Sequence, residues 1–380
     1  MDVVLAAAGA GWEAAVIGEI EASRSLRLVR RCVDVADLLA VAQTDVASAA
    51  LVSTDLAGLD ADTVYRLERA GIRVAAIEAD EQRCRGLGIE RRLSLGTLET
   101  IARDVSVAAP EVISPDSGRL VALWGPAGAP GRSTVALSIA SAAAAKGIDT
   151  VLVDADTYGG SLAQMLAVLD DVSGLMAACR AANNGRPGEV VDHLLGVDPG
   201  LRLLTGLPRA DMWPQVRAGA LDLVLRQLRG SAELVVVDCG FAIEPGSGSG
   251  GASRNQSTLQ VLEQADDVVA VGRADPVGLA RLVRGLHDLG EVLRDVTPTV
   301  VINMMRPSLG WNEREVTTTL RRLTGTTPVA FLPFDQAGLD LALMAGRTPR
   351  QAVPTSPFVA RVEVLAAALA PRGVVASSTG

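Results

Sequence analysis

Short apolar runs alternate with stretches in which apolar residues recur every three or four positions, beginning at the N-terminus. In the stretch 12–22, Trp12, Val16 and Ile20 fall on one helical face. The apolar runs of this first region are 3–8, 25–31, 49–53 and 73–78, and the helical stretches are 12–22, 35–43, 61–71 and 96–105. Strands that alternate with helices of this length predict a parallel sheet with helices on both faces.

A second and larger region begins at residue 118. The segment 106–117 contains Pro and Ser and lacks a period, so we interpret it as a linker between domains of residues 1–105 and 118–371. The strands expected in the second domain are 119–124, 149–154, 201–205, 233–238, 267–272, 298–303 and 328–333. Seven strands with helices between them predict one doubly wound α/β domain. The Gly/Ser-rich stretch 241–256 is predicted to be a mobile loop, and 372–380 a disordered tail.

Composition narrows the class of protein. Hydrophobic residues make up 49% of the 380 residues and aromatic residues 3%, which favours aliphatic cores. A net charge of −9 argues against a constitutive nucleic-acid binder. No apolar run reaches 18 residues, so no transmembrane segment is expected. The four cysteines are scattered and form no CxxC pair, which suits a reducing cytosol.

The first domain resembles the response-regulator receiver, a flavodoxin-like fold, in its layout. Asp55 follows the expected third strand, where a receiver carries its phosphorylated aspartate. However, the first strand ends in "LAAAGAG" rather than in the acidic pair that holds Mg²⁺, and "GIERRLSLG" contains no lysine after the fifth strand. We therefore interpret residues 1–105 as a pseudo-receiver, used for docking or dimerisation, in which Asp55 is an ordinary loop aspartate.

The stretch "LVALWGPAGAPGRSTVAL", residues 120–137, has the layout of a phosphate-binding loop between a strand and a helix. Such a loop wraps backbone N–H groups around phosphate oxygens at a helix N-terminus, which requires small residues, and adds one cation and one hydroxyl. The matching residues are Gly125, Gly128, Gly131, Arg132, Ser133 and Thr134. Alone this is a weak signal, because a Gly/Pro turn before a helix is common.

Carboxylates at the ends of two later strands strengthen the hypothesis. "TVLVDADTYGG" ends an apolar strand in Asp154 and Asp156, and "ELVVVDCG" ends another in Asp238. Parallel α/β sheets bind ligands at the carboxyl ends of their strands. Together with Ser133 at the helix start, these acids supply the parts of a site for a nucleotide and Mg²⁺.

On these motifs, residues 118–371 resemble the MinD/ParA-type P-loop ATPases, whose loop reads lysine, two glycines, a variable residue and Gly-Lys-Thr-Thr. Aligned on Gly131, this sequence has Ala127 at the first lysine, Gly128 and Ala129 at the glycine pair, Pro130 at the variable residue, Arg132 at the second lysine, and Ser133 with Thr134 at the Thr pair. The resemblance implies ATP or ADP with Mg²⁺. It places Ser133, Asp154 and Asp238 at the metal, Asp156 and Arg132 at the catalytic positions, and Asn303, Pro333 and Phe334 around the base.

Two substitutions bear on hydrolysis. Arg132 keeps the positive charge of the usual lysine, so nucleotide binding survives, but its planar guanidinium is wider than an ammonium and cannot follow the transferred phosphoryl group as a compact charge. Ala127 removes the lysine that reaches across a dimer in MinD/ParA relatives. We therefore expect weak or absent hydrolysis.

A degenerate receiver followed by such a domain is the arrangement of CpaE/TadZ pilus-assembly proteins and of actinobacterial septum-site-determining, Ssd-like proteins. The resemblance implies a cytoplasmic positioning factor, a homodimer with partners in a pilus, secretion or division apparatus, recruited to the pole or septum at the inner face of the membrane. It leaves open the choice between pilus and septum and whether ATP is hydrolysed.

Three alternatives remain at this point. A ParA-like DNA-partitioning ATPase needs a cationic stripe, whereas the arginines around 202–229 and 273–284 are interspersed with acids, so strong DNA binding is not expected. A catalytically dead scaffold would use the loop only as a turn. A membrane-cycling protein needs a basic C-terminal helix, but Phe358, Val362, Leu365 and Leu369 are spaced as a core stripe.

Overall fold

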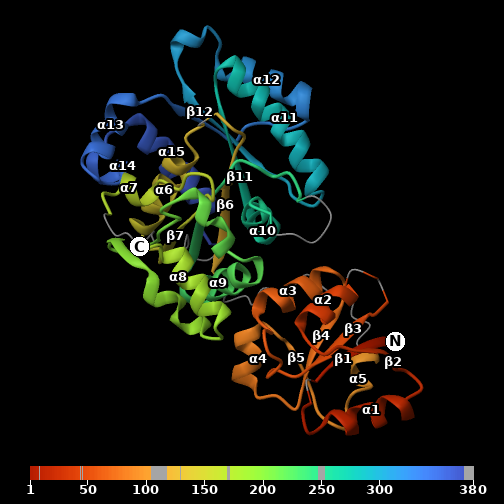
Figure 1. Cartoon of the computed structure of the whole chain (residues 1–380). Coiled ribbons are helices and arrows are strands. Elements are labelled where there is room, and N and C mark those ends of the chain that lie inside the picture. Colours follow the sequence, from red (N-terminus) through yellow and green to blue (C-terminus); the bar gives the residue numbers. More distant parts are fainter. Residues whose placement is uncertain are drawn as a thin grey trace, which may run out of the picture. The chain divides into compact units, whose positions relative to one another are not determined.

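The chain divides into two compact units, each built around one sheet (Figure 1). The first contains residues 1–114 with 178–190 and 217–224, and the second contains the rest. The computed structural model describes residues 1–371 except 8, 43, 45, 104–117, 129, 169–171 and 247–252. The expected linker 106–117, the tail 372–380 and part of the expected loop 241–256 therefore lie outside the described residues.

The first unit holds a five-stranded, all-parallel sheet in the order β2-β1-β3-β4-β5, which is the flavodoxin-like order. Its strands are β1 (Asp2–Ala6), β2 (Arg27–Arg31), β3 (Ala49–Val52), β4 (Arg73–Ile77) and β5 (Arg91–Leu93). Its helices are α1 (Glu13–Ala22), α2 (Val35–Ala42), α3 (Ala61–Arg69), α4 (Glu81–Leu87) and α5 (Thr100–Arg103). The receiver assignment itself stays a prediction.

Both faces of this sheet are covered, as the sequence pattern predicts. Val3 and Leu5 of β1 belong to one core, with Val16 and Ile20 of α1, while Val4 and Ala6 belong to another. Alternate residues of a strand point to opposite faces, so a fully apolar strand needs a helical layer on each side.

The second unit holds an eight-stranded sheet in the order β13-β12-β11-β6-β10-β7-β9-β8. Its strands are β6 (Arg119–Trp124), β7 (Thr150–Ala155), β8 (Leu195–Asp198), β9 (Leu201–Leu204), β10 (Leu234–Cys239), β11 (Asp267–Arg273), β12 (Thr299–Met305) and β13 (Ala330–Pro333). All neighbours pair in parallel except β8 and β9. The seven predicted strands are confirmed, and β8 is an eighth that the prediction lacked.

The helices that follow β6 are α6 (Arg132–Ala144), α7 (Leu162–Met165), α8 (Gly174–Asn183), α9 (Ala218–Ser231), α10 (Gln256–Gln264), α11 (Pro276–Val292), α12 (Glu313–Thr324), α13 (Gln336–Met344), α14 (Pro349–Ala352) and α15 (Pro357–Leu369). All belong to the second unit except residues 178–183 of α8 and 218–224 of α9, which belong to the first. Helix α6 is buried from Val135 to Ala144, and α15 shares its core. The predicted core stripe of α15 is confirmed, since Phe358, Val362, Leu365 and Leu369 are all buried.

The central strands position the site. Strand β6, which leads into the Gly-rich loop, lies between β11 and β10, and β10 lies between β6 and β7. The carboxyl ends of these four parallel strands therefore meet at one edge of the sheet. Nowhere in the described part of the chain is a helix both long and apolar enough to cross a bilayer.

Candidate functional site

The Gly-rich loop joins β6 to α6, as predicted. Gly131 is the N-cap of α6 with φ of 86°, a left-handed conformation that favours glycine, and a Cβ there would lie 2.5 Å from Nδ2 of Asn303. Ser133 and Thr134 are half-buried in the first turn of the helix, where backbone N–H groups lack helical partners. The predicted residue Ala129 lies outside the described residues.

Asp154 and Asp238 lie side by side at the ends of neighbouring strands, where they are register partners in the β7–β10 pair. Asp154 accepts backbone hydrogen bonds from Asp156 (3.3 Å) and Leu162 (3.0 Å), so it organises the turn that follows β7. Burial raises the pKa of Asp154 to about 6. The structure thus brings together the two strand-end acids predicted from sequence.

Asp238 is the most unusual group of this edge. It is fully buried, and among the described residues neither carboxylate oxygen makes a hydrogen bond of good geometry, although the Ser133 hydroxyl is close enough to interact with it. Burial and the neighbouring Asp154 raise the pKa of Asp238 to about 8, while Ser133 and Arg132 act in the opposite direction. A buried carboxylate without partners is costly, so this position calls for a proton or a cation.

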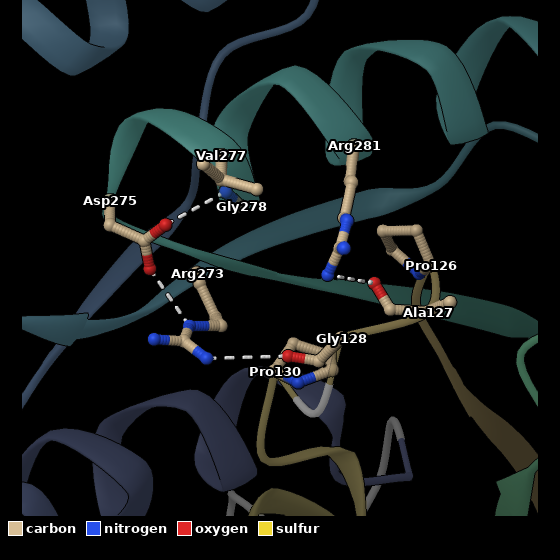
Figure 2. A pocket seen from close by; sticks show the side chains of 9 residues that line it. All are labelled: Pro126, Ala127, Gly128, Pro130, Arg273, Asp275, Val277, Gly278 and Arg281. Carbon is tan, nitrogen blue, oxygen red and sulfur yellow. Dashed lines mark hydrogen bonds and ion pairs between the residues drawn. The ribbon is translucent and has the colours of Figure 1, made fainter.

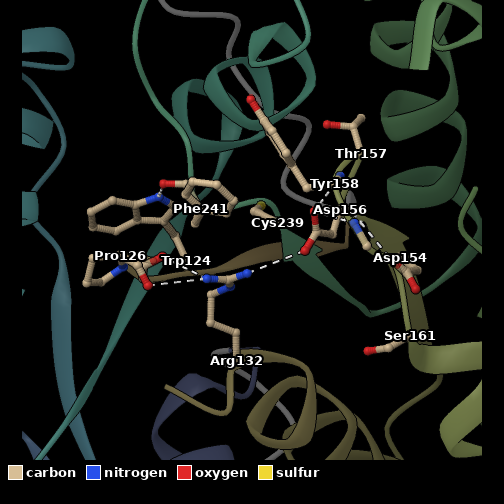
Figure 3. A network of polar contacts seen from close by, with 12 residues as sticks. Trp124, Pro126, Arg132, Asp154, Asp156, Thr157, Tyr158, Ser161, Cys239 and Phe241 are labelled. Carbon is tan, nitrogen blue, oxygen red and sulfur yellow. Dashed lines mark hydrogen bonds and ion pairs between the residues drawn. The ribbon is translucent and has the colours of Figure 1, made fainter. Parts of the chain in front are cut away.

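Arg132 forms the charged link between the loop and the acids (Figure 3). Its Nη2 lies 3.4 Å from Oδ2 of Asp156, and its Nη1 donates to the carbonyls of Gly125 (2.9 Å) and Pro126 (3.5 Å). The side chains of Arg132 and Asp156 are only 11% and 9% exposed. Asp156 also accepts backbone hydrogen bonds from Tyr158 and Gly159. The guanidinium therefore lies between the end of β6 and the turn after β7.

An aromatic and cationic clasp joins the segments that follow β7 and β10. The rings of Tyr158 and Phe241 lie 4.7 Å apart, and the guanidinium of Arg254 lies 3.9 Å from the Tyr158 ring. Arg254 donates to the Thr157 carbonyl, and the Trp124 indole donates to the Phe241 carbonyl at 3.2 Å. Sequence reasoning did not identify this clasp, because its members are far apart in the chain.

The residues expected around a base lie at the ends of β12 and β13. The Asn303 amide donates to the Pro130 carbonyl at 2.8 Å, so it ties β12 to the Gly-rich loop. Pro333 pairs with Met305, and the Phe334 N–H donates to the Met305 carbonyl. The half-exposed ring of Phe334 lies 5.3 Å from the Arg306 guanidinium. The Arg306 guanidinium therefore covers one face of this exposed ring.

Two further arginines contact the loop and were not among the predicted site residues. Arg273, at the end of β11, donates to the Gly128 carbonyl, and Arg281, on α11, donates to the Ala127 carbonyl, both at 3.4 Å (Figure 2). In the sequence they fall within 273–284, where the interspersed acids gave no indication of a site. Only the adjacency of β11 and β6 brings them to the loop.

The donor set suits Mg²⁺. Within the described ranges, no three His, Cys, Asp or Glu side chains converge on one point as a ready-made metal cage. Magnesium, however, keeps several waters and is usually held by one or two carboxylates together with phosphate oxygens. The orphaned Asp238 oxygens beside Ser133 fit that requirement. Asp154 fits it less directly, because its oxygens already accept two backbone hydrogen bonds.

Comparison with known proteins places the fold. No protein-family model and no curated protein matches this sequence. Among solved structures, a ParA family ATPase from Chlorobium tepidum matches with a TM-score of 0.57 at 17% identity over 66% of this chain and 99% of its own. The cell division ATPase MinD of Pyrococcus furiosus gives 0.54 at 16%, over 66% and 97%. The septum site-determining protein MinD of Pyrococcus horikoshii, complexed with Mg-ADP, gives 0.51 at 16%, over 66% and 94%. The chain therefore contains an α/β domain with the fold of the MinD/ParA P-loop ATPases.

Proposed function

We propose that this chain is a nucleotide-dependent localisation factor that binds Mg-ATP or Mg-ADP at its deviant P-loop and hydrolyses ATP slowly or not at all. The observation that carries the proposal is the buried Asp238, whose unpartnered oxygens lie beside Ser133 at the start of α6. A helix N-terminus attracts phosphate, and the buried carboxylate next to it calls for a proton or a cation, a demand that bound Mg²⁺ would meet.

Each residue has a part in this binding. The backbone of Gly128 and Gly131 and the first turn of α6 would face the phosphates, with Ser133 and Thr134 as hydroxyl donors. Ser133 and Asp238 would hold Mg²⁺, and Asp154 would support them. Bound Mg²⁺ would neutralise charge on the phosphate oxygens. Asn303, Pro333 and Phe334 would surround the base.

The same geometry argues for weak hydrolysis. Arg132 is the cation that the loop provides, and in the structure it is held by Asp156 and by two carbonyls of its own loop. Stabilisation of a transferring phosphoryl group requires a cation aimed at the charge that develops on it. The guanidinium of Arg132, held by Asp156 and the loop carbonyls, can attract the bound nucleotide but is not free to follow the phosphoryl group during its transfer. Asp156, which orients this guanidinium, is then a positioning residue.

The biological role follows the resemblance noted in the sequence. Solved proteins of this fold include a MinC:MinD cell division complex from Aquifex aeolicus, which supports a protein partner. We propose a homodimer that places a pilus or secretion apparatus, as CpaE/TadZ proteins do, or acts at the septum, with recruitment to the pole or septum. Several arginines that a DNA-binding stripe would need are paired with acids, such as Arg202 with Asp149 and Arg229 with Asp266.

Calorimetry on the full chain tests nucleotide binding. The wild type is titrated with ATP and with ADP, each with and without Mg²⁺. We expect binding of both Mg-nucleotides, and we expect Asp238→Ala to remove most of the dependence on Mg²⁺. Asp55→Ala, which changes an exposed aspartate of the first unit, is the matched control and should bind as the wild type does. Absence of heat with either nucleotide at high protein concentration would show that the site assignment is wrong.

A further inference from the structure

A cavity of about 200 Å³ lies between the Gly-rich loop and the start of α11 (Figure 2). The loop contributes residues 126–128 and Pro130, and β11 with α11 contributes Arg273, Asp275 and Arg281. Asp154, Asp156 and Asp238 do not line this cavity. The two arginines therefore surround a space beside the loop that none of the proposed Mg²⁺ ligands lines.

The loop backbone is built to admit one of these guanidiniums. A Cβ on residue 128 would lie 2.1 Å from Nη1 of Arg281, so any side chain there would displace the arginine. Arg281 donates to the Ala127 carbonyl at 3.4 Å, a distance at the far end of the hydrogen-bond range. A guanidinium carries five N–H donors, so most of the donor capacity of Arg281 is left for a ligand.

Arg273 is held in place by Asp275, whose Oδ2 accepts from Nε at 2.8 Å. The other oxygen of Asp275 caps α11 by accepting from the Gly278 N–H at 2.9 Å. Both carboxylate oxygens of Asp275 are therefore occupied by hydrogen bonds within the protein, and one of them fixes the orientation of the Arg273 guanidinium. With two arginines and one aspartate, the cavity carries a net charge of +1 beside the N-terminus of a 17-residue helix. The ligand that suits it is an anion.

This cavity differs from the phosphate cradle of the loop. A cradle presents backbone N–H groups, whereas Ala127 and Gly128 present their carbonyls to Arg281 and Arg273. An anion here must be bound by the guanidinium groups, whose planar forks match the geometry of phosphate oxygens. Arg132 does not contribute, because Asp156 and two carbonyls hold it elsewhere.

We propose that the cavity is an oxyanion subsite for a phosphate group, with Arg273 and Arg281 as its donors. The phosphate has two chemical sources. One is the terminal phosphate of a nucleotide bound at the loop, and this source rests on the proposed function. The other is a separate phosphate-bearing molecule. In either case the arginines supply positive charge next to Ala127, which has none.

Calorimetry on the full chain tests the subsite with inorganic pyrophosphate, Mg-ATP and Mg-ADP. Arg273→Ala, Arg281→Ala and the double variant are compared with the wild type. Arg284→Ala is the matched control, since Arg284 is exposed on the same helix and does not line the cavity. Loss of a charge-assisted hydrogen bond should weaken binding roughly tenfold per arginine. The control should bind as the wild type, and thermal unfolding of all variants should show that they fold.

The two sources give different results. If the subsite takes the terminal phosphate of the nucleotide, the arginine variants weaken Mg-ATP binding more than Mg-ADP binding. If it takes a separate molecule, pyrophosphate binds the ADP-saturated wild type and not the double variant. The proposal is overturned if the double variant binds all three ligands as the wild type does, or if Arg284→Ala weakens binding equally. Arginine-dependent pyrophosphate binding without any nucleotide binding would overturn the proposed function and leave the subsite standing.

Discussion

The two sheets of this chain are built on one plan, a mainly parallel sheet with helices on both faces, but different residues follow their strands. In the first unit, β3 is followed by Asp55, whose side chain is 90% exposed and 4.0 Å from Arg83. In the second, β7 and β10 end in Asp154 and Asp238, both buried and adjacent. A solvated carboxylate costs nothing and does little, whereas buried ones destabilise the fold unless a ligand or proton compensates them. This difference in burial indicates a ligand site at Asp154 and Asp238 and none at Asp55.

The largest effect expected from this comparison is on phosphate release. We expect the wild type to release phosphate from ATP on the order of a hundredfold or more below an active ATPase, because the loss of one aimed cation costs a few kcal/mol in the transition state. Steady-state release is measured for the wild type, Arg132→Lys and Arg132→Ala. Turnover at the level of an active ATPase in the wild type that disappears in Arg132→Ala would contradict this prediction.

Gly131→Ala should lower the free energy of unfolding by about 2–3 kcal/mol, because it combines left-handed strain with displacement of the Asn303 amide. Gly96→Ala in the first unit is the control. Gly96 has a similar φ of 85° with open space around its Cβ position, so only the strain of about 1–2 kcal/mol applies. Chemical denaturation of both variants checks the difference. Equal losses would show that the loop tolerates a side chain.

Asp238→Asn should stabilise the chain in the absence of ligand, and more so at higher pH. Folding raises the pKa of Asp238 from 3.8 to about 8, so the folded state retains a proton that the unfolded chain releases. Stability is therefore lost as the pH rises from about 4 through 8. The melting temperature of Asp238→Asn should exceed that of the wild type by a few degrees at pH 8 and by less at pH 5. Asp55→Asn, which changes an exposed aspartate, is the control variant for this measurement.

The smallest effect is expected in the first unit. Incubation with acetyl phosphate and Mg²⁺ should leave the intact mass of the protein unchanged, because the acidic pair and the lysine of a phosphorylated receiver are missing. A stable mass gain that Asp55→Ala abolishes would show that the two units differ less than we propose.

Much of this architecture could be predicted from periodicity. Buried parallel strands are continuous apolar runs, and all seven predicted in the second unit are present. Strand β8 was not predicted from the sequence, because Leu195–Asp198 is partly exposed and lies at the edge of the sheet, where it pairs with β9 alone. The Pro199-Gly200 turn before β9 was the available signal, since a tight turn ahead of an apolar run is typical of a hairpin.

The candidate site was predictable only along the strand ends. Asp154, Asp156 and Asp238 follow apolar runs, so their place at one edge could be inferred from the sequence. The positions of Arg273, at the end of β11, and Arg281, on α11, could not be inferred, because only the strand order brings them to a loop that lies far earlier in the chain. The sequence likewise could not show that the Asp238 oxygens make no hydrogen bond of good geometry, because that depends on which side chains surround them in the folded domain.

The thiol of Cys239 stands directly after Asp238, is fully buried, and has a pKa raised well above its usual value by burial and by Asp238. In the folded state it is shielded from alkylating reagents, which react with exposed thiolates. Its alkylation therefore requires the end of β10 to open. The rate of alkylation thus measures how often the structure opens locally around Asp154, Asp156 and Asp238. A ligand that binds between α6 and β10 should lower the rate at which the Cys239 thiol is alkylated. The native thiol would then report how often the site opens with and without ligand.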